Sequence, residues 1–338
     1  MTVDCKLEVS VIIPVYNAEP FLRKAVEAAE QQEVVKEIIL VEDKSPDQSW
    51  KLCLKLEKEY KKVKAFQHSD KGNHGCGATR NYGLTLATYE YVTFADADNY
   101  ILPNRYDKDI HIFEKYPEAD GVYNCMGIHY YSEASKQQFL DTVNQEILTF
   151  SQPVKPEDVP LVFFSVHPEQ VCGSWGIDAL TIKKDLFKKS GVFNTNLKLQ
   201  QDVDLFIKMS FVGKFFPGEL IKPTCIRGVH DQQRSTINSM LNTYRSERWK
   251  SLNFWVNDSN NNVGVKYKHI FNDNYNHFLI QNSSKLLSIG YFFRFLLAHP
   301  LSFKKPYGDF DFNFWKVFGK NWLTLRIISF KNRLNFKK

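Results

Sequence analysis

The chain has 338 residues, of which 43% are hydrophobic and 24% are charged, a balance typical of a globular protein that buries an extensive core. The net charge of +6 is uneven, because residues 283–338 hold eleven Lys and Arg against two acids (+9), which leaves −3 for the rest. This distribution argues against a nucleic-acid-binding body and indicates an anionic membrane surface as a partner of the C-terminal tail.

The sequence contains neither a secretion signal nor a membrane helix. Residues 1–8 carry three charges and lack the apolar centre of a signal peptide. No apolar run approaches the roughly 20 residues that cross a bilayer. The six cysteines are scattered, without the close pairs of a zinc site, as expected for reduced thiols. We therefore expect a cytoplasmic protein, at most peripheral on the inner face of the membrane.

The first hundred residues alternate β-branched strands with amphipathic helices, the pattern of βαβ units on a parallel sheet. The predicted elements are strand 9–14, helix 20–32, strand 37–41, helix 49–60, strand 64–66, a glycine-rich loop 72–77 that opens a helix through residue 87, and strand 91–94. Because ligands of open parallel sheets bind at the carboxyl ends of the strands, the polar residues that follow these strands should gather at one edge.

The rest of the chain is less regular. Residues 106–168 are expected to hold a helix and insertions at the sheet edge, and residues 185–190 and 203–212 are expected to be helical. Gly191 is well placed to cap the first of these two helices. From residue 238 onward the pattern becomes aromatic and helical.

We divide the chain accordingly into two domains. Residues 1–236 form the predicted catalytic domain, with a nucleotide-binding half (1–105) and an acceptor and metal half (106–236). Residues 237–338 form an aromatic, basic and mostly helical extension. This extension either docks on anionic lipid or packs on the catalytic body or on a second copy as a homodimer.

Two carboxylates, Asp96 and Asp98, stand one residue apart at the end of strand 91–94. Alternation along an extended chain sends both side chains to one side, where they repel each other unless a cation lies between them. Oxygen ligands suit Mg²⁺ or Mn²⁺, which can also bridge a diphosphate. A solvated acidic turn is the alternative, but the apolar strand in front of the pair favours a metal site.

Five short motifs occur in the order and at the spacing of a large enzyme family. They occupy residues 11–17, 39–47, 78–83, 94–98 and 201–205. Together they resemble glycosyltransferase family 2, inverting enzymes with the GT-A fold, over about residues 8–235. The resemblance implies an α/β fold with a Rossmann-like, mostly parallel central sheet flanked by helices, to which this chain adds a C-terminal helical extension.

The resemblance also assigns a donor site for a UDP-sugar. It implies that Pro14, Tyr16 and Asn17 line the nucleoside pocket, that Asp43 accepts the imide N–H of uracil, that Arg80 lies against uracil and diphosphate, that Asp96 contacts ribose or metal, and that Asp98 binds the metal. A core aromatic is the alternative for Tyr16, and a turn-forming residue is the alternative for Asp43.

The family's catalytic base corresponds to Asp202, which would deprotonate the acceptor hydroxyl. Gln201 replaces the glutamate that usually precedes it, and Asp204 is the second candidate for the base. Asp202 as the N-cap of helix 203–212 is an alternative that is compatible with catalysis.

Further residues complete the implied site. His230 is expected to bind the metal, which favours Mn²⁺ over Mg²⁺ because imidazole is a good ligand for manganese. Arg234 and Ser235 are candidates for holding the diphosphate. Gly173 and Trp175 are expected to shape the sugar and acceptor pocket, with a core role as the alternative for Trp175.

A second, weaker similarity lies in the C-terminal extension. Residues 245–249 are similar to the Q-x-x-R-W of processive polysaccharide synthases, but the leading Gln is missing. We interpret this segment as part of an ordinary helix.

The sequence thus predicts an inverting, metal-dependent glycosyltransferase that moves a sugar from a UDP-sugar to a hydroxyl of a glycan or lipid-linked acceptor, in cell-surface polysaccharide synthesis. A nucleotidyltransferase is one alternative, but the segment after the first strand lacks the expected glycine- and lysine-bearing loop. A degenerate, non-catalytic scaffold is the other, and only Gln201 favours it.

Overall fold

The computed structural model describes residues 7–142, 147–230 and 241–282. The chain divides into two units, Met1–Lys268 and His269–Lys338, and every site residue discussed below belongs to the first. The domain boundary predicted after residue 236 stays a prediction, as does the division into two halves.

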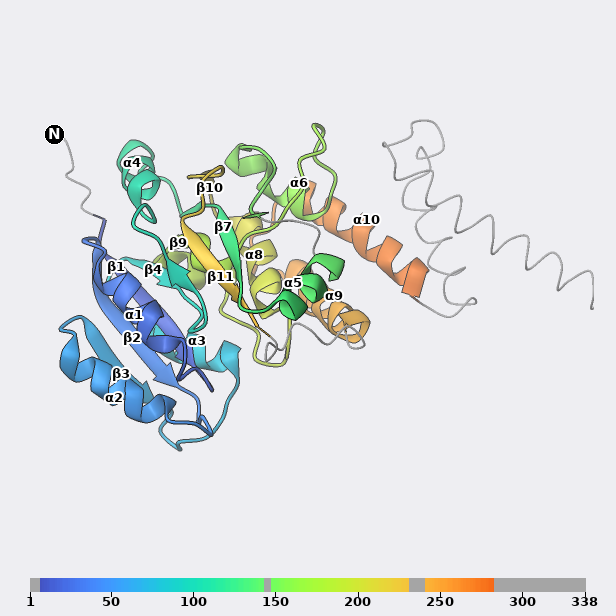
Figure 1. Ribbon diagram of the computed structural model, residues 1–338. Helices are drawn as coiled ribbons and strands as arrows, with labels where there is room; N and C mark the ends of the chain where they lie inside the picture. Colours follow the sequence, from blue (N-terminus) through green and yellow to red (C-terminus); the bar gives the residue numbers. More distant parts are fainter. Residues whose placement is uncertain (1–6, 143–146, 231–240, 283–338) are drawn as a thin grey trace, which may run out of the picture. The chain divides into compact units, whose positions relative to one another are not determined.

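A mainly parallel sheet of seven strands, in the order β10-β6-β9-β4-β1-β2-β3, forms the centre of the first unit (Figure 1). Its strands are β1 (Val9–Val15), β2 (Val35–Glu42), β3 (Val63–Gln67), β4 (Tyr91–Phe94), β6 (Gly121–Tyr123), β9 (Leu180–Lys183) and β10 (Phe215–Pro217). Only β9 runs antiparallel to its neighbours. Each of the four predicted strands lies within an observed strand, so the predicted α/β sheet is confirmed.

Helices cover both faces of this sheet, which explains why β1 is apolar at nearly every position. Alternate residues of β1 face two separate cores, with Val11 and Ile13 in one and Ile12 in the other. The first core is covered by α1 (Leu22–Glu30) and α2 (Ser49–Glu59), and the second by α3 (Cys76–Leu86) and α8 (Gln201–Val212).

Helix α3 lies unusually close to the sheet at Gly83. A Cβ atom at this position would lie 2.4 Å from Cγ2 of Ile12, which is fully buried in β1. The glycine therefore sets how closely α3 packs on β1 and β2.

A second sheet of four short strands, in the order β5-β11-β7-β8, contributes one side of the site. Its strands are β5 (Tyr100–Ile101), β7 (Met126–Tyr130), β8 (Ile147–Leu148) and β11 (Cys225–Val229). Strand β5 begins two residues after Asp98, and β11 ends one residue before His230. Because β5 and β11 are paired, the two candidate metal ligands are brought to the same place.

Shorter elements and the C-terminal helices complete the described chain. They are α4 (Asp107–Lys115), α5 (Glu133–Thr142), α6 (Val159–Phe163), α7 (Phe187–Ser190), α9 (Leu241–Asn257), α10 (Val265–Asn282), and 3₁₀ turns at Pro156–Asp158, Ile177–Ala179 and Lys184–Leu186. Gly191 caps α7 with a left-handed φ of 77°, as predicted. Within residues 7–142, 147–230 and 241–282, no helix has both the length and the apolar character to cross a membrane.

Candidate active site

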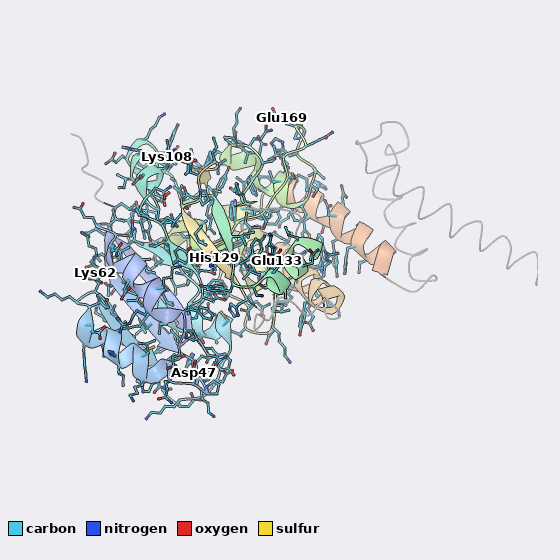
Figure 2. The ribbon with its side chains drawn as sticks, in the orientation of Figure 1. Asp47, Lys62, Lys108, His129, Glu133 and Glu169 are labelled. Carbon is cyan, nitrogen blue, oxygen red and sulfur yellow. The ribbon has the colours of Figure 1, made fainter. Side chains whose placement is uncertain are left out.

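The turns that follow β1 and β2 meet at the carboxyl edge of the sheet, which Asp47 marks in Figure 2. Pro14 is buried within β1, whereas Tyr16 is 43% exposed and so is not a core aromatic. Asn17 has a left-handed φ of 51°, and its backbone N–H donates to Oγ of Ser45 at 3.1 Å. The two turns therefore form one hydrogen-bonded surface.

Asp43 ties the glycine-rich loop to this edge. Its carboxylate oxygens accept the backbone N–H groups of His74 and Gly75 at 2.7 and 2.8 Å. Its carbonyl oxygen accepts the side-chain amide of Asn73 at 2.7 Å. Because the Asp43 side chain is only 3% exposed, it holds the loop that leads into α3. The predicted contact with uracil stays a prediction.

Arg80 of α3 joins the Asp96 carboxylate to the neighbourhood of Asp202. Its guanidinium donates to Oδ1 of Asp96 at 2.5 Å and is 8% exposed. Burial by itself would lower the pKa of Arg80, but its interactions with Cys76 and with the carboxylates of Asp96 and Asp202 outweigh this effect and raise it. Arg80 is therefore a buried cation bound to the predicted D-x-D motif, and its pKa responds to the charge of the predicted base.

The turn that contains the D-x-D motif is held by hydrogen bonds to Asp178, a residue that our sequence analysis missed. Asp178 is 1% exposed; its carboxylate accepts the backbone N–H of Asp96 at 2.8 Å and the side-chain amide of Asn99 at 2.9 Å. Its carbonyl oxygen accepts Nε of the buried Arg105 at 2.9 Å. Asp178 thus fixes the backbone before Asp98 and the side chain that follows it.

The electrostatic position of Asp178 is unusual. Burial raises the pKa of the Asp178 carboxyl well above its usual range, and the negative charges of Asp96 and Asp98 raise it further. The one signal in the sequence is an acid between Ile177 and Ala179, in an otherwise apolar run. That signal does not identify a partner 82 residues away.

Asp98 and His230 lie against each other, with 3.2 Å between Oδ2 and Nε2. The His230 ring stacks on Phe21 at 4.7 Å. Gly228 lets the β11 backbone approach Asp98, because a Cβ atom at position 228 would lie only 2.4 Å from the carbonyl oxygen of Asp98. Both side chains keep some exposure, 25% for Asp98 and 15% for His230. The structure therefore brings the two predicted metal ligands together.

Asp98 and His230 fit a divalent ion whose remaining ligands are water molecules and substrate oxygens. In the described part of the chain, no group of three or more His, Cys, Asp or Glu side chains is arranged to hold a metal. Mg²⁺ characteristically keeps several waters and binds through one or two carboxylates together with substrate phosphates, and imidazole extends the fit to Mn²⁺. Phosphate oxygens of a bound nucleotide would complete such a site.

Asp202 lies in the first turn of α8, where the helix dipole favours a carboxylate. It is half-buried, and its Oδ1 accepts the backbone N–H of Val203 at 2.9 Å. The N-cap is Gln200, not Asp202, so the alternative that made Asp202 the cap was wrong. Asp204 is fully buried and bound to Nζ of Lys208 at 2.5 Å, so it faces the interior of the protein.

Gln201 joins the start of α8 to the start of α3. Its side-chain amide donates to the carbonyl of Leu197. A Cβ atom on Gly77 would lie 2.8 Å from its Oε1. The residue that replaces the family's glutamate therefore has a packing role between the two helices that carry Arg80 and Asp202.

Among the described residues, neither Trp175 nor Gly173 has a recorded contact with the carboxylates of this cluster. Trp175 is 4% exposed and packs among aromatic rings, 4.6 Å from Phe215 and 5.4 Å from Tyr123, surroundings that favour the core alternative. Gly173 has a φ of 121° and passes so close to Thr149 that a Cβ would lie 2.0 Å from its carbonyl oxygen. Arg234 and Ser235 lie outside the described residues.

Comparison with known proteins identifies relatives that are glycosyltransferases. The family model for glycosyl transferase family 2 matches residues 10–160. An uncharacterized glycosyltransferase of Rickettsia typhi is 31% identical over 237 residues, which is 69% of this chain and 67% of the relative. A poly(ribitol-phosphate) beta-glucosyltransferase of Bacillus spizizenii is 35% identical over 98 residues, 28% of this chain and 15% of that enzyme.

A similar fold is found among solved structures. S. aureus TarS 1-349 in complex with UDP-GlcNAc matches with a TM-score of 0.53 and 17% identity, over 83% of this chain and 82% of that one. Together with the family match, this likeness confirms the predicted GT-A fold. The chain belongs to glycosyltransferase family 2.

Proposed function

We propose that this protein transfers a sugar from a UDP-sugar to a hydroxyl of a cell-surface glycan or lipid-linked acceptor, with inversion at the anomeric carbon. The observation that carries the proposal is Arg80, whose buried guanidinium binds Asp96 of the D-x-D motif. Its helix α3 packs at Gly77 against Gln201, the residue that precedes Asp202. The carboxylate for the donor side and the carboxylate for the acceptor side are thereby assembled in one cluster.

Asp202 is the proposed general base. It takes the proton of the acceptor hydroxyl while that oxygen attacks the anomeric carbon, and the bond from that carbon to the β-phosphate oxygen breaks. UDP leaves with the electron pair of the broken bond. Asp202 is suited to this role because it is half-buried at a helix N-terminus, whereas Asp204 is already bound to Lys208.

The donor would bind at the carboxyl edge of the sheet. Tyr16 offers an exposed ring for the nucleoside, and the loop held by Asp43 borders the same edge. Asp98 and His230 would hold Mn²⁺ or Mg²⁺. When bound, the ion supplies positive charge that stabilises the departing diphosphate.

The relatives suggest which substrates to test first. TarS was solved with UDP-GlcNAc, and the Bacillus spizizenii relative is named for glucosyl transfer to poly(ribitol phosphate). We therefore propose UDP-GlcNAc and UDP-glucose as the first donors and polyol-phosphate chains as acceptors. A cytoplasmic location, membrane binding by residues 283–338 and a homodimer stay predictions.

Thermal unfolding with nucleotides, with and without Mn²⁺ or EDTA, tests the donor site. A ligand that binds only the folded state raises the unfolding temperature in proportion to its occupancy. We expect UDP to stabilise the protein only when metal is present, and Asp98→Asn to lose this effect. If no uridine nucleotide stabilises the wild type, the result would instead support the degenerate, non-catalytic alternative.

A further inference from the structure

Arg248 of α9 is a cation to which the described residues offer no ion-pair partner, and its guanidinium lies 6.0 Å from the ring of the adjacent Trp249. Helix α9 packs on α8 around Ser251, whose hydroxyl accepts from Asn194 at 2.9 Å and from Lys208 at 3.4 Å. Arg248 precedes Ser251 by three residues and so lies on the same side of α9. Its Nε is buried without a hydrogen-bond partner, and it forms no ion pair within residues 7–142, 147–230 and 241–282.

The surroundings of Arg248 disfavour its charge. Burial and then the positive charge of Arg245 lower the pKa of Arg248 to about 10, and Asp204 and Asp202 offset this only in part. Asp204 is unable to serve as a full partner because it is bound to Lys208 at 2.5 Å. Since a buried unpaired charge is costly, this position suits a ligand that brings negative charge.

The two arginines near Asp202 have different neighbours. Arg80 interacts with Asp96 and Asp202, whereas Arg248 interacts with Asp204 and Asp202. Helix α9 runs alongside α8 in the same direction, because Ser251 contacts Lys208 and Trp255 stacks on Phe211. Arg248, one turn before Ser251, therefore lies beside the first turns of α8, whereas Arg80 reaches the D-x-D motif from α3. An anion at Arg248 would therefore belong to the molecule that brings the hydroxyl to Asp202, not to the diphosphate of the donor.

We propose that Arg248 binds a phosphate of the acceptor, adjacent to the hydroxyl that Asp202 deprotonates. The acceptor class is then a chain of polyol phosphodiesters, and a neutral glycan would not satisfy this position. The planar guanidinium matches phosphate oxygens with two parallel hydrogen bonds. This inference rests on the proposed function for the role of Asp202.

Binding measurements with the full chain test the assignment. The probes are a short ribitol-phosphate oligomer, free ribitol as its neutral counterpart, and UDP with Mn²⁺. The variants are Arg248→Met and, as a matched control, Lys250→Met, which removes a charge from an exposed position of the same helix. We expect Arg248→Met to lower the affinity for the oligomer about 10- to 100-fold, while Lys250→Met and the UDP affinity of both variants change little.

The stability of the free variants separates binding from a structural role. Because the fold disfavours the Arg248 charge, Arg248→Met should unfold at the same temperature as the wild type or higher. The proposal is overturned by a lower unfolding temperature with unchanged oligomer affinity, by equal losses in the two variants, by a loss of UDP affinity, or by a wild type that does not bind the oligomer. A wild type that binds the oligomer but not UDP refutes the proposed donor instead.

Discussion

The two sides of Asp202 are built differently. On the donor side, Asp43 holds the loop before α3 and Asp178 holds the turn between Asp96 and Asn99, and each carboxylate accepts two hydrogen bonds. On the acceptor side, Nε of Arg248 has no hydrogen-bond partner and Arg248 forms no ion pair within the described chain. The carboxylates of the donor edge are thus hydrogen-bonded before any ligand binds, although Nε of Arg80 has no hydrogen-bond partner among the described residues. The acceptor side differs because its cation has no bound acid there, whereas Arg80 is bound to Asp96.

This difference follows from what each side has to recognise. A buried polar network in which every group is satisfied fixes one geometry, which suits a nucleotide that always binds in the same way. A charge that the protein leaves uncompensated is favourable only when a ligand of opposite charge arrives. The asymmetry predicts that donor-side variants lose structure, whereas acceptor-side variants lose ligand binding.

The largest expected effect is that of Asp202→Asn, because an amide is unable to take the acceptor proton. We expect the rate of UDP release with donor and acceptor present to fall about 100- to 10,000-fold. The affinity for UDP, measured by titration, should stay within about twofold of the wild type. A loss of less than about tenfold would mean that another group is the base.

Asp178→Asn tests whether the donor side is a structural network. The amide of Asn99 is oriented by the backbone N–H of Gly228, which donates to its Oδ1 at 3.0 Å. An asparagine at 178 therefore sets one N–H group against another, at Asp96 or at Asn99. We expect the free energy of unfolding to fall by about 1–3 kcal/mol.

The same variant should weaken metal binding in the presence of UDP, because Asn99 no longer fixes the backbone next to Asp98. We expect about a tenfold loss of Mn²⁺ affinity, measured from the signal of free Mn²⁺ in electron paramagnetic resonance. Asp185→Asn is the control, since the Asp185 side chain is 74% exposed and pairs with Lys188. Unchanged stability and Mn²⁺ affinity in Asp178→Asn would show that Asp178 does not organise the turn.

Gly83→Ala examines the donor side through packing instead of hydrogen bonds. The new Cβ would lie 2.4 Å from the fully buried Ile12, and such overpacking costs about 1–3 kcal/mol. The helix preference of alanine over glycine offsets about 1 kcal/mol of this. We expect a net destabilisation of about 1 kcal/mol in urea unfolding. Gly264→Ala, with no atom closer than 3.7 Å to its Cβ, should have little effect, and a stabilised Gly83→Ala would contradict the close approach.

Local pattern was sufficient to predict the donor half of the fold. The apolar run of β1 and the D-x-D after β4 identify a buried parallel sheet with acids at its carboxyl edge, and the structure has both. These features depend on neighbours in sequence, and periodicity records them. The left-handed Gly191 cap of α7 was predictable for the same reason.

Contacts between distant segments were not predictable in this way. Strand β9 runs antiparallel between β4 and β6. The turn just before β9 brings Asp178 into hydrogen-bond contact with Asp96 of the D-x-D motif, 82 residues earlier in the chain. The missing partner of Arg248 likewise depends on how α9 packs against α8. A single sequence gives the residue types in such cases but not the pairing, because the pairing is set by tertiary packing.

The smallest expected effect concerns pH and the loop before α3. The ring of His68 lies 4.2 Å from the ring of His74, tilted by 33°, and its Nε2 lies 3.6 Å from Oδ1 of Asp43. Burial and then the charge of His74 lower the pKa of His68, against the opposing effect of Asp43 and Asp70. The folded protein therefore prefers neutral His68. This contribution to stability is fully present above the pKa of about 6.5 that histidine has in the unfolded chain, and it is lost as the pH falls through the lower pKa of the folded state.

We expect the stability of the wild type to fall between pH 7.5 and 5.5 more steeply than that of His68→Gln. The acceptor-side variant Arg248→Met should follow the slope of the wild type. If stability falls with pH equally steeply in the wild type and in His68→Gln, the loop before α3 is not the acid-sensitive part of the site.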